Sequence, residues 1–279
     1  MKNHLPKLSS MILPAFFTLR KNKKIGKVGI QINKTFRSVQ IEKHNLEKFN
    51  SYFGFRTQVP LTYLYTIAQR AQTAVMLTNK FTLPIPGMMH IENKLIKEND
   101  FNPQKNFDIT VSASVEYKER GSLKPVFEVE ISQQNCVVAI CKSTYIIKRK
   151  SKKPKTKKQK VEPLKRTNHE SVWSFIPKIG KEYANISGDK NPIHTSLIFA
   201  KLFGFKKQIM HGWYSICKIE QFVEEKFKIA TSEISVNFST PVLLPTQAKF
   251  KLKKEKNKEF YYELVNNSNT KIHLNGVIR

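Results

Sequence analysis

The chain has 279 residues, of which 40% are hydrophobic and 11% aromatic, so it can build a packed core and is not mostly disordered. Lys and Arg total 49 against 21 Asp and Glu, which gives a formal net charge of +28. Such an excess suits nucleic acid, an anionic membrane, an acidic protein or a phosphate-bearing ligand, and it does not indicate a fold. Three Cys without regular spacing argue against a disulfide scaffold and against a cysteine zinc site, and favour a cytoplasmic protein.

An apolar run near the start of the chain, residues 11–19, reads MILPAFFTL. It faintly resembles a signal peptide, but Pro14 interrupts it and no small-residue cleavage site follows. No stretch of the sequence approaches the roughly 18 apolar residues that a transmembrane segment needs. We interpret the run as a packing segment, and a targeting or membrane-surface role is the alternative.

The first half of the chain predicts one long helix and then several strands. Residues 61–77 carry Leu64, Ile67 and Ala71 on one side of a helix. Alternating apolar patterns predict strands at residues 90–96, 107–117, 126–131 and 137–147.

A basic block follows, because residues 148–160 read KRKSKKPKTKKQK, with nine Lys or Arg among thirteen residues. A block of this composition cannot bury surface, so we expect a solvated, flexible linker. We therefore predict a first domain at residues 1–147, a basic linker at residues 148–168 and a second domain at residues 169–279.

The second half repeats the order of the first. A helix is predicted from Pro177, which suits a first helical position, and it stops at residues 187–189. A longer helix is predicted at residues 212–227, and strands at residues 234–239, 248–252, 260–265 and 272–278. One long helix followed by antiparallel strands, twice over, suggests a duplicated α+β unit.

Two residues that can carry chemistry lie close together in the second half. Asp189 precedes His194 by five residues, and Asn191-Pro192 between them forces the chain away from helix. A carboxylate and a neutral imidazole about one water apart can polarise that water, which suits proton transfer at carbon or addition of water. No GxSxG nucleophile sequence is present.

Structural interpretations of these residues stay open at this point. Asp189 could make an Asx turn or cap the next helix, and His211 could simply begin a helix. The spacing of Asp189, His194 and His211 matches no standard zinc or iron signature, so we expect no metal.

A longer ordered set of residues carries a family resemblance. Residues 183–194 read YANISGDKNPIH, and Ala200, residues 204–205 (GF) and residues 209–212 (IMHG) follow in order. Residues 238–245, FSTPVLLP, complete the set. Together they resemble the hydratase motif of the MaoC-like dehydratase family, which includes the (R)-specific enoyl-CoA hydratases.

The resemblance implies a double hotdog of the α+β class, in which each unit is a long central helix wrapped by an antiparallel sheet. Residues 61–77 would be the first central helix. The first unit lacks the motif, so the resemblance implies one active site, in the second unit, while the first helps to accommodate the acyl chain. We interpret His90, beside an apolar strand, as structural.

The implied reaction is reversible hydration of trans-2-enoyl-CoA to (3R)-3-hydroxyacyl-CoA. Asp189 and His194 would hold the catalytic water, and the Gly212 N–H would stabilise the thioester oxyanion. The expected substrate-binding residues are Asn191, His211, Lys206 and Lys207, although the two lysines could be ordinary solvated charges. No metal or redox cofactor is expected.

Three alternatives remain at this point. The substrate carrier could be acyl carrier protein, which would make the protein a (3R)-hydroxyacyl-ACP dehydratase. The same fold could serve a thioesterase, against which the motif argues. A non-catalytic acyl-thioester-binding or polyanion-binding protein is the alternative of another class. We expect no specific nucleic-acid partner, no transmembrane segment, and a monomer or a homodimer of double hotdogs.

Overall fold

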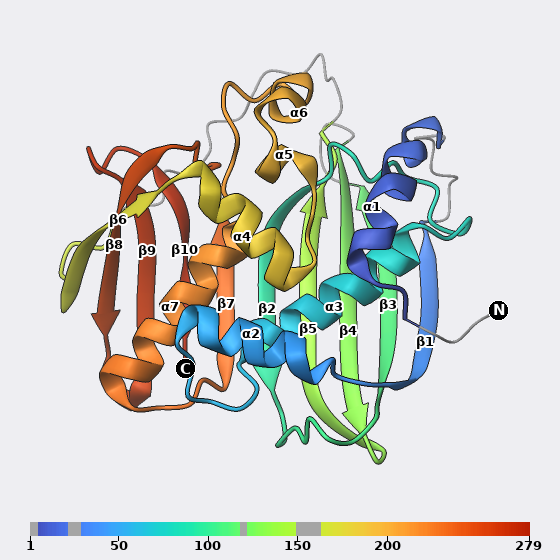
Figure 1. Cartoon of the computed structure of the whole chain (residues 1–279), viewed down its shortest axis with the longest axis horizontal. Coiled ribbons are helices and arrows are strands. Elements are labelled where there is room, and N and C mark those ends of the chain that lie inside the picture. Colours follow the sequence, from blue (N-terminus) through green and yellow to red (C-terminus); the bar gives the residue numbers. More distant parts are fainter. Residues whose placement is uncertain (1–4, 22–28, 118–121, 149–162) are drawn as a thin grey trace.

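The computed structural model describes residues 5–21, 29–117, 122–148 and 163–279 (Figure 1). The strands are β1 (Gln31–Val39), β2 (Met89–Lys97), β3 (Phe107–Tyr117), β4 (Leu123–Gln133), β5 (Cys136–Ile146), β6 (His169–Phe175), β7 (Glu233–Phe238), β8 (Thr246–Lys254), β9 (Phe260–Asn266) and β10 (Ile272–Ile278). The helices are α1 (Leu8–Phe17), α2 (Lys43–Phe53), α3 (Leu61–Met76), α4 (Pro177–Ser187), α5 (Pro192–Thr195), α6 (Leu197–Leu202) and α7 (Gly212–Phe227), with 3-10 turns η1 (Thr18–Arg20) and η3 (Lys256–Lys258).

All ten strands form one sheet in the order β1-β3-β4-β5-β2-β7-β10-β9-β8-β6, and neighbouring strands are antiparallel. The first five strands in this order come from the first half of the chain and the last five from the second. Pairing of β2 with β7 joins the two sets, with Asn93 opposite Val236 and Leu95 opposite Ile234. The helices α2, α3, α4 and α7 lie over one face of this sheet (Figure 1). This arrangement confirms the predicted α+β double hotdog.

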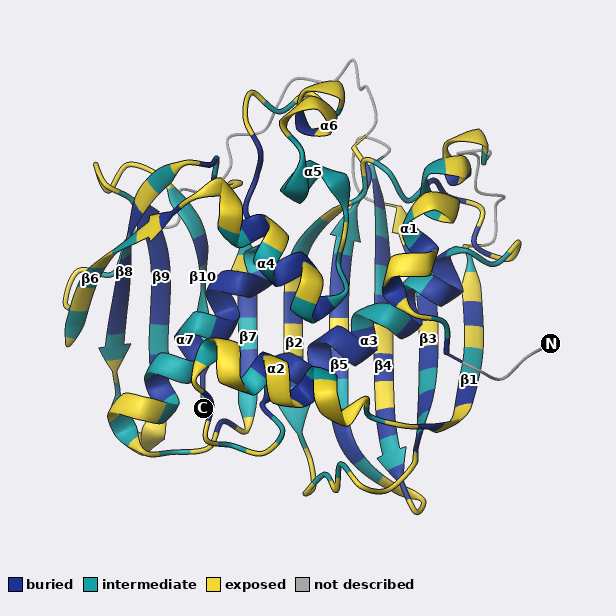
Figure 2. Ribbon diagram, viewed as in Figure 1, coloured by how far each residue is buried: buried dark blue, intermediate teal, exposed yellow. Residues whose placement is uncertain are grey.

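The core lies between the sheet and the two long helices, α3 and α7. Nearly all of α3 is buried, and the strands alternate between buried and more exposed residues, as expected for a sheet with one covered face (Figure 2). Leu64, Ile67 and Ala71, which the sequence places on one helical side, all belong to the core cluster. The described helices include none that is both long enough and apolar enough to cross a membrane.

A carboxylate from the second half caps the central helix of the first half. Pro60 precedes α3 and has no side chain that can accept the first free N–H groups of the helix. Glu220 of α7 takes this role, because its Oε1 accepts the Leu61 N–H at 2.9 Å and its Oε2 accepts the Thr62 N–H at 3.0 Å. One turn later, Glu224 Oε1 accepts the Thr57 N–H at 2.6 Å. The two halves therefore share polar as well as apolar contacts.

The N-terminal segment is fastened to the first half by two basic residues. Arg70 of α3 donates to the carbonyls of Leu5 and Pro6, at 3.0 and 2.8 Å. The Lys21 ammonium donates to the carbonyl of Met76, the last residue of α3, and to those of Thr78 and Phe81 in the segment that follows. Helix α1 contains Pro14, which the sequence analysis treated as an interruption of the apolar run.

Residues 149–162 of the predicted linker (148–168) lie outside the described residues. The last part of the predicted linker is described and is not free: the Leu164 N–H donates to Glu263 and the Asn168 N–H to the Leu252 carbonyl, so the chain is already held to the second half before β6 begins. His90 is partly buried and packs against the rings of Tyr65, Tyr145 and Phe238, and burial lowers the pKa of its imidazole to about 3. This is the structural role that was predicted for it.

Candidate active site

Asp189 is positioned by the end of α4. The helix stops because Gly188 adopts φ 77°, a left-handed conformation that favours glycine, and the chain then turns away from the helix. One carboxylate oxygen of Asp189 accepts the Asn191 N–H at 3.2 Å, which is an Asx turn. One oxygen of Asp189 thus makes the Asx turn that was one interpretation of this residue, and the other oxygen has a different partner.

That second partner comes from the other half of the protein. Gln69, on α3, donates its side-chain amide to Asp189 Oδ2 at 2.8 Å. Gln69 was not predicted as a site residue, because the first half carries no local motif and the contact depends on how α3 crosses the sheet. The site is therefore built from both halves of the chain.

Two histidines complete the cluster. His194 lies on the single turn α5, and its Nδ1 donates to the Ile209 carbonyl at 3.0 Å. Since a carbonyl can only accept, the neutral ring carries its free lone pair on Nε2. His211 donates from Nε2 to the backbone carbonyl of Asp189 at 3.0 Å. The two imidazole rings lie 3.8 Å apart between centroids.

His211 Nδ1 is buried and has no hydrogen-bond partner among the described residues. A buried acceptor without a partner carries a free-energy cost of about 1–3 kcal/mol, so this nitrogen is suited to receive a hydrogen bond from water or from a ligand. One ligand atom each from Asp189, His194 and His211 lies within 4.8 Å of the others. A carboxylate and two imidazoles at this separation could also hold a divalent metal ion.

The electrostatics of the cluster favour one negative charge and two neutral rings. Burial lowers the pKa of His194, although the Asp189 charge and the Ile209 carbonyl oppose that change. Burial also lowers the pKa of His211, well below its usual range. Burial raises the pKa of Asp189, but the neighbouring imidazoles, the Gln69 amide and the Asn191 N–H outweigh it, so the net direction is downward. Near neutral pH the site thus holds a carboxylate that can accept a proton beside two neutral imidazoles.

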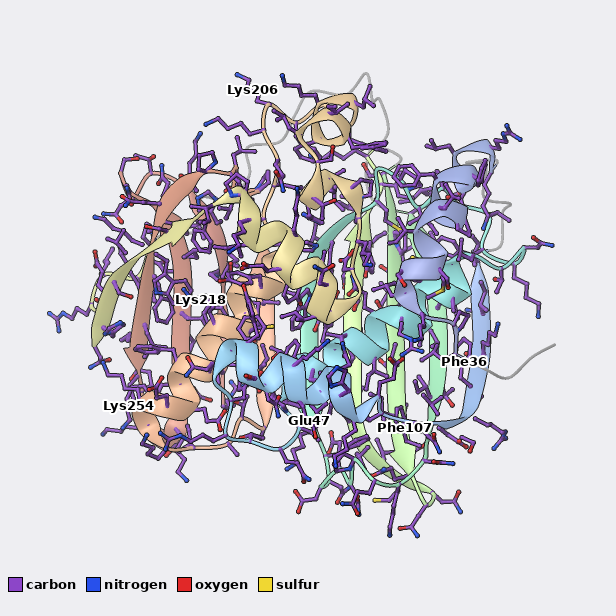
Figure 3. The ribbon with its side chains drawn as sticks, viewed as in Figure 1. Phe36, Glu47, Phe107, Lys206, Lys218 and Lys254 are labelled. Atoms are coloured by element: carbon purple, nitrogen blue, oxygen red, sulfur yellow. The ribbon has the colours of Figure 1, made fainter. Side chains whose placement is uncertain are left out.

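The remaining predicted site residues lie around this cluster or outside it. The Asn191 side chain accepts the Ile193 N–H at 3.4 Å, so it caps α5 and fixes the loop. Gly212 is the first residue of α7 and directly follows His211. Lys206 and Lys207 are exposed on the loop after α6, and Figure 3 shows Lys206 at the outer edge of the molecule.

Two glycines allow close packing around the site. A Cβ added to Gly180 of α4 would lie 2.3 Å from the His194 carbonyl oxygen, so glycine is needed for this helix to pack against α5. A Cβ on Gly212 would lie 2.5 Å from Phe238 Cε1. Glycine at position 212 thus has a packing reason, which is separate from the N–H donor role predicted for this residue.

We expect Gly212→Ala to lower the free energy of unfolding by about 1–3 kcal/mol, because the new methyl group overlaps the Phe238 ring. In a protein that already carries Phe238→Leu, Gly212→Ala should lower the free energy of unfolding much less, because the overlapping ring is absent. Urea unfolding of the three variants would measure this. An unchanged midpoint for Gly212→Ala would show that the ring simply moves aside.

Comparison with known families and curated proteins agrees with this geometry. A family model described as a MaoC like domain matches residues 149–276. A 3-hydroxyacyl-thioester dehydratase X from Mycobacterium tuberculosis is 28% identical over 222 residues, which cover 77% of each chain. A 57-residue stretch, 20% of this chain and 3% of the relative, is 42% identical to the fatty acid synthase beta subunit TOXC of Cochliobolus carbonum.

Solved structures with the same arrangement of elements include HtdX of Mycobacterium tuberculosis. It superposes with a TM-score of 0.73 and 26% identity, over 89% of this chain and 99% of HtdX. The peroxisomal multifunctional enzyme type 2 of Drosophila melanogaster matches with a TM-score of 0.66 and 18% identity, over 89% of this chain and 48% of that one. A MaoC-like dehydratase from Phytophthora capsici matches with a TM-score of 0.62 and 17% identity, over 90% and 95% of the two chains. At these two lower identities the likeness concerns the fold alone.

Proposed function

From the match of residues 149–276 to the family model described as a MaoC like domain, we propose that the protein is a hydro-lyase acting on acyl thioesters. It adds water reversibly to a trans-2-enoyl thioester and forms the (3R)-3-hydroxyacyl thioester, with coenzyme A as the carrier. The observation that carries the proposal is the cluster of Asp189, His194 and His211 within 4.8 Å. The likeness to a curated 3-hydroxyacyl-thioester dehydratase supports the choice of reaction.

In the proposed mechanism, one water molecule lies between the Asp189 carboxylate and the Nε2 lone pair of His194. As the water oxygen forms a bond to C3 of the substrate, this pair accepts one proton of the water. The electrons of the C2–C3 double bond move toward the thioester, and a proton from the pair is delivered to C2. The sum is addition of one H₂O, so the two residues finish in the protonation state in which they began.

Negative charge develops on the thioester oxygen during this step and needs a hydrogen-bond donor. The first N–H groups of a helix have no partner within the helix and carry its positive end. The Gly212 N–H begins α7 next to His211, so we assign it to the thioester oxygen. Asn191 keeps the loop in place, and His211 Nδ1 offers a further acceptor to the bound water or substrate.

The direct test is hydration of crotonyl-CoA by purified protein, followed as loss of the enoyl-thioester absorbance. Formation of the 3-hydroxyacyl product without release of free thiol supports the proposal. Release of CoA thiol would indicate a thioesterase instead. No turnover of crotonyl-CoA or of longer enoyl-CoA chains would contradict the proposal.

The carrier can be decided with the same assay. Lys206 and Lys207 are our candidates for the carrier phosphates, since both are exposed on the loop after α6. A surface this basic also suits acidic acyl carrier protein, so rates on matched CoA and carrier-protein thioesters should be compared.

We propose that one chain forms a complete site, because Gln69 and Asp189 come from its two halves.

Gln69 is proposed as a positioning residue, and Gln69→Leu should lower kcat by about 10- to 100-fold with little change in KM. The estimate corresponds to losing a hydrogen bond to a charged group, about 1.5–3 kcal/mol. Without this donor the pKa of Asp189 rises, so the acid limb of the kcat profile should move to higher pH. Gln221→Leu is a matched control, because Gln221 donates to the surface carboxylate of Glu225 at 2.7 Å. Coincident pH profiles for Gln69→Leu and wild type would refute the positioning role.

A further inference from the structure

Large exposed apolar side chains concentrate in one region of the protein. Among the described residues, the five most exposed large hydrophobic side chains are Leu202 (74%), Ile198 (71%), Leu13 (67%), Phe17 (60%) and Leu19 (55%). All five lie on α1, η1 or α6, and we call them the apolar platform. Single exposed apolar residues need no explanation, but a group of this size marks an interaction surface.

The platform is continuous although its two parts are far apart in the sequence. The Phe16 ring of α1 lies 6.4 Å from the Phe199 ring of α6 and 5.7 Å from the Phe203 ring that follows, measured between centroids. Helix α1 is buried on one side only, through Leu8 and Met11. Figure 2 shows α6 at the top and α1 at the upper right of the view, each with several exposed residues. The sequence interpretation of residues 11–19 as a packing segment therefore describes one side of α1.

The charged residues of the same segments are all basic. Residues 1–41 and 190–219 contain no Asp or Glu. Arg20 of η1, Lys201 of α6, and Lys206 and Lys207 after α6 are all exposed. Lys206 points away from the body of the protein in Figure 3. The region thus combines exposed apolar side chains with these four basic side chains, which have no ion-pair partner among the described residues.

We propose that the apolar platform binds the surface of an anionic lipid bilayer. Its apolar side chains enter the boundary between headgroups and acyl chains, and the surrounding Lys and Arg side chains contact lipid phosphates. Helices of 10 and 6 residues lie on such a surface, since crossing it takes about 20 residues. A second copy of this chain fits the platform less well, because it would bring the same uncompensated positive charge into the interface.

The platform also adjoins the candidate active site. Helix α6 begins two residues after α5, which carries His194. Binding of this face to a membrane would place the site beside a lipid phase that dissolves acyl chains. The binding itself does not depend on the proposed reaction, because it is measured without substrate.

Flotation of the full chain with vesicles tests the proposal. Wild type should bind vesicles that contain phosphatidylglycerol and bind pure phosphatidylcholine at least about tenfold more weakly. Leu13→Asp combined with Leu202→Asp should lower the affinity for the anionic vesicles by at least about tenfold. Val172→Asp combined with Ile176→Asp is the matched control, because these exposed apolar residues lie on and next to β6 and receive the same added charge.

Two double Lys→Gln variants give a second comparison, because both lose the same positive charge and differ only in where it is lost. Lys206→Gln with Lys207→Gln should weaken binding by about fivefold per residue, whereas Lys43→Gln with Lys48→Gln, on exposed positions of α2, should have less effect. Equal loss in the two pairs would mean that overall charge alone attracts the vesicle, which overturns the proposal.

A spectroscopic readout covers the case of a poorly folded variant. Leu202→Trp should show a blue-shifted, enhanced emission when anionic vesicles are added, and Val172→Trp should not. Three further outcomes overturn the proposal: no binding of wild type to anionic vesicles, unchanged binding of the Leu13→Asp and Leu202→Asp double variant, or a dimer in sedimentation that this double variant abolishes.

Discussion

Asp189→Asn should lower kcat for enoyl-CoA hydration by about a thousandfold or more while the protein keeps its fold. General acid–base groups contribute about 10²- to 10⁴-fold, and the asparagine removes the charge that polarises the water. The two oxygens of Asp189 accept from the Asn191 N–H and the Gln69 amide. In asparagine one of these oxygens is replaced by an NH₂ group, which then faces another donor. Single-turnover and steady-state rates with crotonyl-CoA would measure the loss.

A double variant separates the charge from the hydrogen bond. Asp189→Asn with Gln69→Glu restores a donor–acceptor pair between the two side chains but moves the carboxylate onto α3. We expect this variant to stay as inactive as Asp189→Asn. Recovery of activity would mean that only the contact between the halves matters, and the catalytic role of Asp189 would then be wrong.

His194→Gln should cause a loss of similar size, because the Nε2 lone pair disappears while the residue stays polar. His169→Gln is the control, since His169 lies on β6 and contacts Lys226 rather than the cluster. In wild type, activity should fall at acid pH, where His194 takes up a proton. Since burial lowers the pKa of His194, the fall should have its midpoint below the usual histidine value.

Glu220→Ala should lower the free energy of unfolding by about 2–6 kcal/mol, the largest stability change that we expect. The substitution leaves the N–H groups of Leu61 and Thr62 without an acceptor in a buried place, at about 1–3 kcal/mol each. Urea unfolding would measure the change. Glu225→Gln, at an exposed position of the same helix, should change stability by less than about 0.5 kcal/mol. An effect of that small size for Glu220→Ala would contradict the capping role.

The same residue makes stability depend on pH. Burial raises the pKa of Glu220 to about 7, and hydrogen bonds to Leu61 and Thr62 oppose this only in part. The folded protein therefore binds a proton that the unfolded chain has already released above about pH 4.5. The resulting stability is fully present below that pH and is lost as the pH rises through about 7. The free energy of unfolding of wild type minus that of Glu220→Gln should fall by about 2–3 kcal/mol between pH 5 and pH 8.

Sequence patterns predicted the elements that carry strong periodicity. The helix at residues 212–227 begins and ends where predicted, and the helix at residues 61–77 is one residue longer than α3. The four strands predicted in each half are all present. By contrast β1 and β6 were not predicted, because few large apolar residues alternate along them. These strands form the two ends of the sheet, where burial on one face is enough.

The site was predictable to the extent that one continuous motif contains it. Asp189, His194 and His211 lie in one segment of the second half, and a family resemblance gave them roles before any geometry was known. Gln69 lies 120 residues earlier, and nothing around it distinguishes its amide from that of Gln72, which contacts Ser143 instead. Only the crossing of α3 over the sheet decides which of the two amides reaches the carboxylate.

The cap on α3 has a consequence for synthesis of the chain on the ribosome. The first half is made well before Glu220, whose carboxylate lies 159 residues after Leu61 in the sequence. During that interval β2 has no partner on the side that later pairs with β7, so an open strand edge faces other nascent chains. The first half expressed alone should aggregate, and coexpression of the second half should rescue it. During synthesis, the free edge of β2 therefore has to be kept from pairing with other chains until β7 has been made and pairs with it.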